Sequence, residues 1–175
     1  MAIQTSPKTV AIFSESSSTT AIDGPYYQST EAAITGGGEG TFLCISRAVG
    51  GTSSNNPRYN TGEWAVQRGM AFDQWILDET AGYIALRYGD DDPTNTNWMI
   101  DKVIASGRKA LLINYPQLPD TPAWTAANRL RLAQSNTNMD TISVTRGIPV
   151  ADIRNMVVPL SEMHPDGLLL LPVAT

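Results

Sequence analysis

The sequence has little of several residue types that common functional sites need. Among its 175 residues there is one cysteine, Cys44, and one histidine, His164. A single thiol cannot form an internal disulfide or a cysteine-rich zinc site. Any chemistry that needs an imidazole must therefore use His164, and oxidative cross-linking within the chain is excluded.

Charged residues are also scarce, and long apolar runs are missing. Asp, Glu, Lys and Arg make up 17% of the chain, and the formal net charge is −5. Such a chain lacks the basic surface that nucleic acid requires, so we expect no nucleic-acid partner. No run of about 20 apolar residues could span a bilayer. The opening residues do not have the order of a signal peptide, so we expect none here, and the compartment stays open between cytoplasmic and exported.

The sequence also lacks the usual phosphate-binding loops. The glycine-rich segment Gly36–Gly40 is not followed by a Walker lysine, and the GxGxxG pattern is absent. Three consecutive acids, Asp90–Asp92, resemble a cation site, but neighbouring side chains cannot all face one ion, and turns favour aspartate. We therefore expect neither a cofactor nor a bound metal.

Five short runs are nearly continuous in apolar residues, as strands buried on both faces are. Helical spacing lies between them, and strands that alternate with helices predict a parallel sheet. We expect one domain over residues 1–175: an α/β fold with a three-layer α/β/α sandwich around a mostly parallel five-stranded sheet. The expected strands are Thr9–Phe13, Thr41–Ile45, Tyr83–Leu86, Ala110–Asn114 and Ile148–Ile153. The expected helices are Glu63–Glu79, Asn97–Ser106 with a cap at Gly107, and one from Thr121 that fades at residues 135–138.

In such sheets ligands bind beyond the carboxyl ends of the strands, and the loops there carry the candidate site. Ser16 follows the first strand and could act as a nucleophile, which needs a base to take its proton. His164, in the last loop, is the base available. Ala48 to Gly51 follow the second strand, where small residues would let backbone N–H groups approach an oxyanion. The alternatives are a helix cap at Ser16, a surface position for His164 and a simple tight turn at the glycines.

The order of these loops resembles the SGNH/GDSL hydrolase family. The blocks FSES, AVGG, YGDDD, ALLINYP and MHP occur in the family's order from Val10 to Gly167. The resemblance implies a flavodoxin-like fold and a serine esterase. It makes Ser16 the nucleophile and His164 the general base, with Ser161 where the family has the aspartate that orients the histidine. In the oxyanion hole it places Ser16, Ala48 and Gly50, with Asp91 at the position of the family's asparagine.

The sequence departs from the family pattern mildly at Ala48, which replaces a glycine but keeps its backbone donor, and more seriously at Asp91 and Ser161. Asp91 has no donor for an oxyanion, and Ser161 has no charge for an imidazolium, although the neighbouring acid Glu162 could take that role. Two hypotheses stay open. The chain is an ester hydrolase acting on an acyl or O-acetyl ester, such as that of a carbohydrate, or a non-catalytic domain that binds carbohydrate or protein. For the second, Tyr26, Tyr27, Tyr59 and Tyr88 are candidate stacking residues, unless they pack at the domain edge. The oligomeric state is left open.

Overall fold

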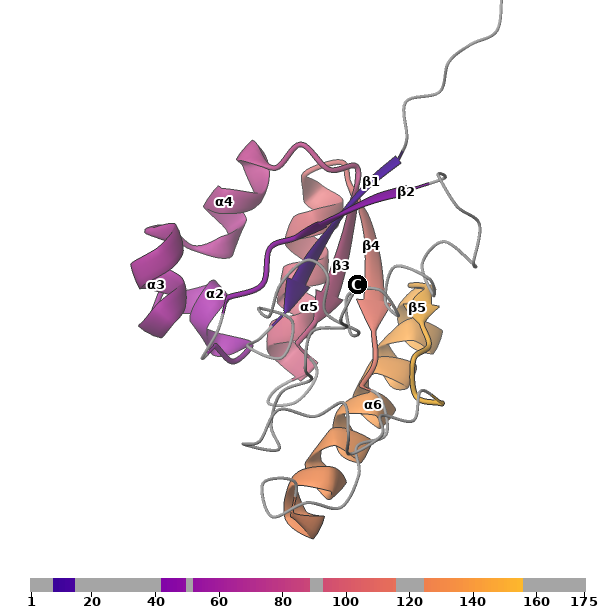
Figure 1. Cartoon of the computed structure of the whole chain (residues 1–175). Helices are drawn as coiled ribbons and strands as arrows, with labels where there is room; N and C mark the ends of the chain where they lie inside the picture. Colours follow the sequence, from indigo (N-terminus) through magenta and orange to yellow (C-terminus); the bar gives the residue numbers. More distant parts are fainter. Residues whose placement is uncertain (1–7, 15–41, 50–51, 89–92, 116–124, 156–175) are drawn as a thin grey trace, which may run out of the picture.

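A computed structural model describes residues 8–14, 42–49, 52–88, 93–115 and 125–155. From residue 42 onward strands alternate with one or more helices, as Figure 1 shows. The strands are β1 (Lys8–Ser14), β2 (Phe42–Ser46), β3 (Tyr83–Arg87), β4 (Lys109–Ile113) and β5 (Val150–Ala151). The helices are α2 (Asn55–Tyr59), α3 (Gly62–Arg68), α4 (Phe72–Asp78), α5 (Pro93–Ala105) and α6 (Ala126–Arg146).

The five strands form one sheet in the order β2-β1-β3-β4-β5, and every neighbouring pair is parallel. This confirms the predicted α/β class with a parallel five-stranded sheet. The order is that of flavodoxin-like folds, in which the chain changes direction across the sheet between β1 and β3. At that point Ser14, the last residue of β1, pairs with Arg87, the last residue of β3.

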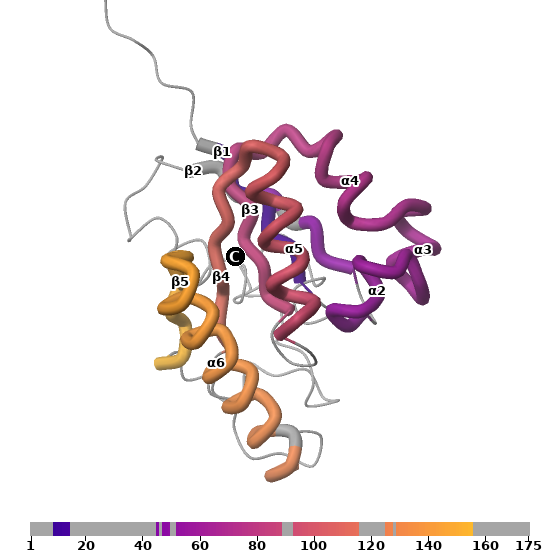
Figure 2. Tube along the Cα trace, turned by 180° about the vertical axis from the view of Figure 1, so that it is seen from behind, coloured from indigo at the N-terminus to yellow at the C-terminus, as the bar shows by residue number. Residues whose placement is uncertain are grey.

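The two faces of the sheet are buried in different ways. On the first face, the strands pack with residues of α3 to α6 in one apolar cluster, and Figure 2 shows α5 and α6 in front of the sheet on this side. The cluster centres on Phe13, whose ring meets Phe72 at 5.3 Å and Trp75 at 4.9 Å, both edge-on. The second face contributes a separate cluster that includes Val10, Ile12 and Ile113. No described helix contributes to this second cluster, so the second outer layer of the sandwich stays a prediction.

The helix predicted over Glu63–Glu79 is wrong, because two helices occupy this stretch. Gly69 ends α3 in the left-handed conformation, with φ of 72°, and its N–H donates to the carbonyl of Ala65. Ala71 is extended and is the N-cap that precedes α4. The apolar spacing is similar on both sides of the break, so the pattern alone could not reveal it. Glycine adopts this conformation without the steric cost that other residues pay.

The other helix predictions fare differently. A helix over Asn97–Ser106 is confirmed in type, although α5 begins at Pro93, and Gly107 follows it with a positive φ of 79°. The expected fading at residues 135–138 is wrong, because α6 continues to Arg146. Its serine and threonine hydroxyls donate to carbonyls four residues earlier, which satisfies them within the helix. These residues are Ser135, Thr137, Thr141 and Thr145.

A buried carboxylate holds the turn that leads into β3. One oxygen of Glu79 accepts hydrogen bonds from the N–H groups of Thr80 and Ala81, at 2.8 and 3.0 Å, and the other accepts from Arg47 Nε at 2.9 Å. Arg108 also donates to the Glu79 backbone carbonyl. Burial alone would raise the pKa of Glu79, but the bonds from Arg47, Ala81 and Thr80 outweigh it and lower the pKa. The turn is thus stabilised by a charged group.

We expect Glu79→Gln to lower the free energy of unfolding by about 2 kcal/mol at pH 7, because a charge-assisted acceptor of three donors is lost. The folded pKa lies below the ordinary value of 4.5, so the contribution of Glu79 is complete above that value and fades as the pH falls through the folded pKa. Urea unfolding of wild type and variant at pH 7 and pH 3 measures both effects. Asp78→Asn, one residue earlier and exposed, is the control; an equal loss in the two variants would contradict the assignment.

Candidate active site

The carboxyl ends of β1, β2 and β3 lie side by side at one end of the sheet, which is called the carboxyl edge below. In Figure 1 the strands run from the top of the view towards the bottom, so this edge faces down. Beyond the last residues of β2, the backbone continues to pair with β1. The N–H of Arg47 donates to the carbonyl of Ile12 at 2.8 Å, and that of Val49 to the carbonyl of Ser14 at 3.1 Å. The loop after β2 is therefore fixed to the end of β1.

These two bonds decide the direction of the N–H of Ala48. In a parallel pair, alternate residues direct their backbone groups to opposite sides. Since Arg47 and Val49 donate to β1, the N–H of Ala48 between them points away from it. Among the residues that the structure describes, none accepts a hydrogen bond from this N–H. It is a backbone donor just past the carboxyl end of β2, the outermost strand on this side of the described sheet.

Two buried hydroxyls brace the junction of these strand ends. The hydroxyl of Tyr88, the first residue after β3, donates to the carbonyl of Ser14 at 2.9 Å. The hydroxyl of Thr52 donates to the carbonyl of Val49 at 2.6 Å, and the two hydroxyl oxygens are 3.4 Å apart. Tyr88 is fully buried, and its own carbonyl accepts a bond from Thr96 of α5. The ends of β1, β2 and β3 are thus joined by side chains as well as by backbone.

A buried guanidinium lies at the same edge. Arg87 is 2% exposed, and its guanidinium carbon lies 4.6 Å from the centre of the Tyr115 ring. A cation over an aromatic face is attracted by the electron-rich π face of the ring. Tyr115 itself is held by Asn136 of α6, whose side chain accepts from the backbone N–H of Tyr115 and donates to its carbonyl. The loop after β4 is therefore tied both to β3 and to α6.

Further along the edge, Asn114 joins β4 to the segment after β5. Its side chain is buried, donates to Asp152 Oδ1 at 2.9 Å and accepts from the backbone N–H of Ile153 at 2.8 Å. Arg154 donates to both oxygens of Asp152 and also pairs with Asp140 of α6. The bonds from Arg154, with a smaller one from Asn114, hold the pKa of Asp152 well below its usual range. Asp152 is ionised at neutral pH and anchors the start of the loop predicted to carry the base.

Of the seven predicted site residues, the structure describes Ala48. Ser16, Gly50, Asp91, Ser161, Glu162 and His164 lie outside the described residues, so their mutual placement stays a prediction. Among the predicted stacking residues, Tyr59 is 59% exposed, whereas Tyr88 is fully buried. The hypothesis that Tyr88 is an exposed aromatic is therefore wrong. Tyr26 and Tyr27 also lie outside the described residues.

Sequence reasoning missed Thr52 and Asn114, which shape this end of the sheet, and gave Tyr88 a different role. One signal for Tyr88 was present. Ile84, Leu86 and Tyr88 recur at every second position, which places them on one face of a strand and its extension. Ile84 and Leu86 belong to the apolar cluster under the helices, and Tyr88 belongs with them.

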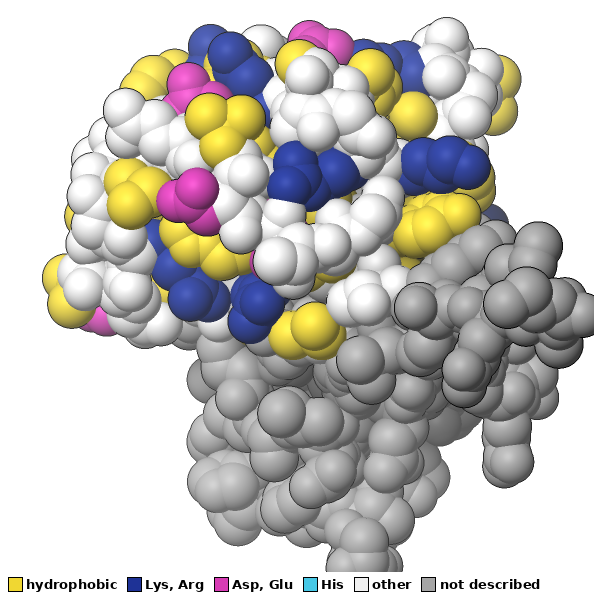
Figure 3. Space-filling view, turned by 90° about the horizontal axis from the view of Figure 1, so that it is seen from above, with side chains coloured by type: hydrophobic (Ala, Val, Ile, Leu, Met, Phe, Trp, Pro, Cys, Tyr) yellow, Lys and Arg dark blue, Asp and Glu magenta, His cyan; other side chains and the backbone are white. Residues whose placement is uncertain are grey.

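The described surface gives no sign of two other kinds of site. None of the helices in the described ranges has the length and apolar character needed to cross a membrane. Among the same residues, no group of three or more His, Cys, Asp or Glu side chains could hold a metal ion. On the face that Figure 3 shows, Lys and Arg side chains are scattered among uncharged and hydrophobic ones and do not merge into one basic patch.

Comparisons with known proteins agree on the fold. No protein-family model and no curated protein sequence matches the chain. Solved structures do match. The psychrotrophic esterase EstA from Pseudoalteromonas sp. aligns over 94% of this chain and 88% of its own, with 13% identity and a TM-score of 0.60. A GDSL-like lipase from Bacteroides thetaiotaomicron aligns over 93% and 80%, with 13% identity and a TM-score of 0.55.

An acetylxylan esterase from Geobacillus stearothermophilus, solved as a catalytic mutant, aligns over 85% of this chain and 77% of its own. The identity is 8% and the TM-score 0.57. The chain therefore has the fold of the GDSL/SGNH esterases and lipases, as its sequence blocks indicated.

We expect Asn114→Ala to lower the free energy of unfolding by about 2 kcal/mol, since it leaves the buried N–H of Ile153 without its acceptor. Urea unfolding at neutral pH measures this loss. Gln134→Ala, at an exposed position of α6, should change stability by less than about 0.5 kcal/mol. A loss at Asn114 no greater than that at Gln134 would show that the link between β4 and the β5 end contributes little.

Proposed function

We propose that the chain is a serine ester hydrolase in which Ser16 is the nucleophile and His164 the general base. The observation that carries the proposal is the position of β1. Its end lies at the point where the sheet changes direction, between the ends of β2 and β3. Ser16 is two residues beyond that end in the sequence, and residues 48–51 follow the neighbouring strand β2. The esterases that share this fold support the same assignment.

The proposed reaction is acyl transfer in two stages. The Ser16 oxygen attacks the ester carbonyl carbon while His164 takes the hydroxyl proton. The negative oxygen that forms accepts hydrogen bonds from the backbone N–H groups of Ser16 and Gly50. The carbon–oxygen bond to the alcohol then breaks, and His164 returns the proton to the leaving alcohol. Water, deprotonated by His164, attacks the acyl-serine and releases the carboxylic acid with free Ser16.

Two positions in this scheme differ from the family, and each has a proposed solution. Asp91 offers no donor when ionised, so the oxyanion relies on backbone N–H groups. The N–H of Ala48 points away from β1, so we assign the donors to Ser16 and Gly50. Ser161 cannot stabilise an imidazolium, and Glu162 is the acid we assign to that task. Removing one oxyanion donor lowers kcat by about 10²–10³-fold. We therefore expect these two substitutions to slow ester hydrolysis without changing the reaction.

We expect Ser16→Ala and His164→Ala each to lower kcat for p-nitrophenyl acetate by about 10⁴-fold or more, because nucleophile and base act as a unit. A fluorophosphonate probe should label the wild type and not Ser16→Ala. Ser106→Ala, which follows α5 at the opposite edge of the sheet, should keep both activities. Equal hydrolysis by wild type and Ser16→Ala would refute the serine mechanism and favour a domain that binds carbohydrate or protein without catalysis.

The substrate class proposed is an acyl or O-acetyl ester of a carbohydrate, supported by the acetylxylan esterase of the same fold. We expect release of acetate from acetylated xylan, and a higher kcat/KM for p-nitrophenyl acetate than for p-nitrophenyl palmitate. Acetate release is followed enzymatically and the nitrophenolate by absorbance, with Ser16→Ala as the blank. Faster hydrolysis of palmitate with no release from xylan would place the chain with the lipases instead.

A further inference from the structure

We propose that the hydroxyls of Tyr88 and Thr52 are positioning groups for the reaction, because they clamp the backbone from which the nucleophile and the oxyanion donor extend. The clamp consists of Tyr88, Thr52, Ser14 and Val49. This inference rests on the proposed function, since it assigns a task to residues near Ser16 and Gly50. Neither hydroxyl contacts the reacting atoms in the scheme above.

The central contact of the clamp is one backbone hydrogen bond. The N–H of Val49 donates to the carbonyl of Ser14 at 3.1 Å, and this is the last described link between β1 and the loop after β2. Both residues are buried. Each is within two positions of a proposed active-site residue: Ser14 precedes Ser16 by two, and Val49 lies between Ala48 and Gly50. A shift of this bond would therefore move nucleophile and donor relative to each other.

The two hydroxyls reinforce that bond from both sides. A hydroxyl carries one proton, and each proton here is committed to a carbonyl. That of Tyr88 goes to Ser14 at 2.9 Å, and that of Thr52 goes to Val49 at 2.6 Å. The separation of 3.4 Å between the two oxygens is then a contact and not a third strong bond. Tyr88 thus connects β3 to β1, while Thr52 closes the loop after β2 on itself.

The clamp is set in rigid surroundings. The Tyr88 ring belongs to the apolar cluster that holds Phe13 and Trp64, and the Tyr88 carbonyl accepts from Thr96 of α5. Burial lowers the local dielectric and strengthens such hydrogen bonds. A site that must hold reacting groups in place is best built on residues whose own rotamers are locked by packing. All four residues of the clamp are buried, which favours such locked rotamers.

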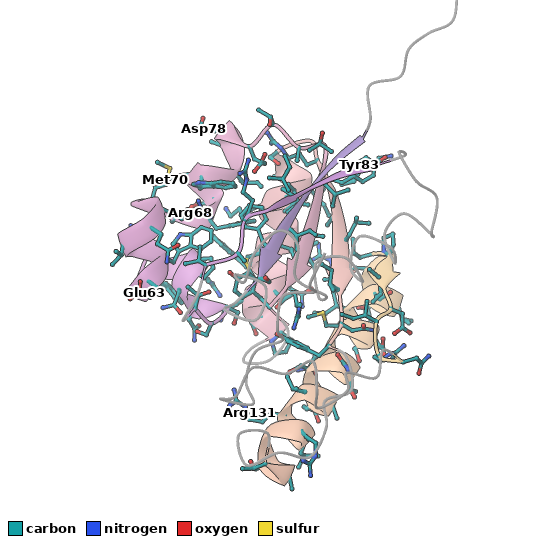
Figure 4. The ribbon with its side chains drawn as sticks, in the orientation of Figure 1. Glu63, Arg68, Met70, Asp78, Tyr83 and Arg131 are labelled. Atoms are coloured by element: carbon teal, nitrogen blue, oxygen red, sulfur yellow. The ribbon has the colours of Figure 1, made fainter. Side chains whose placement is uncertain are left out.

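The test removes one oxygen at a time and compares two tyrosines of the same strand region. Tyr88→Phe and Thr52→Val keep the shape of each side chain and delete the hydroxyl. Tyr83→Phe makes the same chemical change at the opposite end of β3, where Figure 4 labels Tyr83 near the top of the sheet. All variants are first checked for folding by thermal unfolding. The readouts are kcat and KM for p-nitrophenyl acetate and amide hydrogen exchange at Val49.

We expect kcat to fall about 10- to 100-fold in Tyr88→Phe with KM changed by less than about twofold, because misplaced groups slow the chemical step more than binding. The amide of Val49 should exchange at least about tenfold faster. Thr52→Val should show the same signs with smaller changes, and Tyr83→Phe should show neither. Unchanged exchange at Val49 in Tyr88→Phe overturns the clamp, as does a kcat loss equal to that of Tyr83→Phe.

The two proposals can fail separately. If the wild type has no Ser16-dependent activity, the esterase proposal fails, and the exchange measurement alone decides whether the hydroxyls hold the Ser14–Val49 bond. If the wild type is active and Tyr88→Phe is as active, the esterase proposal stands and the clamp is refuted as a positioning device.

Discussion

Strand β1 has to satisfy backbone hydrogen bonds on both of its sides, since β2 and β3 flank it along its length. A strand held in this way cannot shift along either neighbour without losing a ladder of bonds and turning its apolar residues to the wrong face. The end of β1 is therefore among the best-fixed points of the molecule. The edge residues considered above, from the carbonyl of Ser14 to the N–H of Ala48, take their positions from it. The proposed nucleophile follows directly from this fixed end.

The strands could be predicted from the sequence because a strand buried on both faces is nearly continuous in apolar residues. The runs at Thr9–Phe13 and Tyr83–Leu86 differ from β1 and β3 by one residue at one or both ends. The run at Ile148–Ile153 overestimates β5, which pairs with β4 over Val150 and Ala151 only. Apolar content shows that a residue is buried, whereas pairing depends on where the neighbouring strand ends. Strand ends are therefore less predictable than strand existence.

The helices and the site illustrate two other limits. The break at Gly69 lies inside a continuous apolar pattern, and a glycine alone does not say which conformation it adopts. The polar stretch at 135–138 stays helical because its hydroxyls find acceptors one turn back, a local solution that composition does not display. At the candidate site, the order of the loops places Ala48 after the second strand, and its role stays a prediction. The contact between Tyr88 and Ser14 joins residues 74 positions apart, and it depends on the strand order, which spacing does not give.

The buried carboxylate of Glu79 has a consequence at the opposite end of β3. By holding the N–H groups of Thr80 and Ala81 it sets the point at which the chain enters β3. A strand alternates its side chains with a period of two, so the entry point fixes the phase of every later residue. With this phase, Ile84 and Tyr88 face the helices. One residue of slippage would exchange Tyr88 with Arg87 and bring a guanidinium into the aromatic core. Glu79, before the amino end of β3, thus helps to decide which way the side chain of Tyr88 faces just past its carboxyl end.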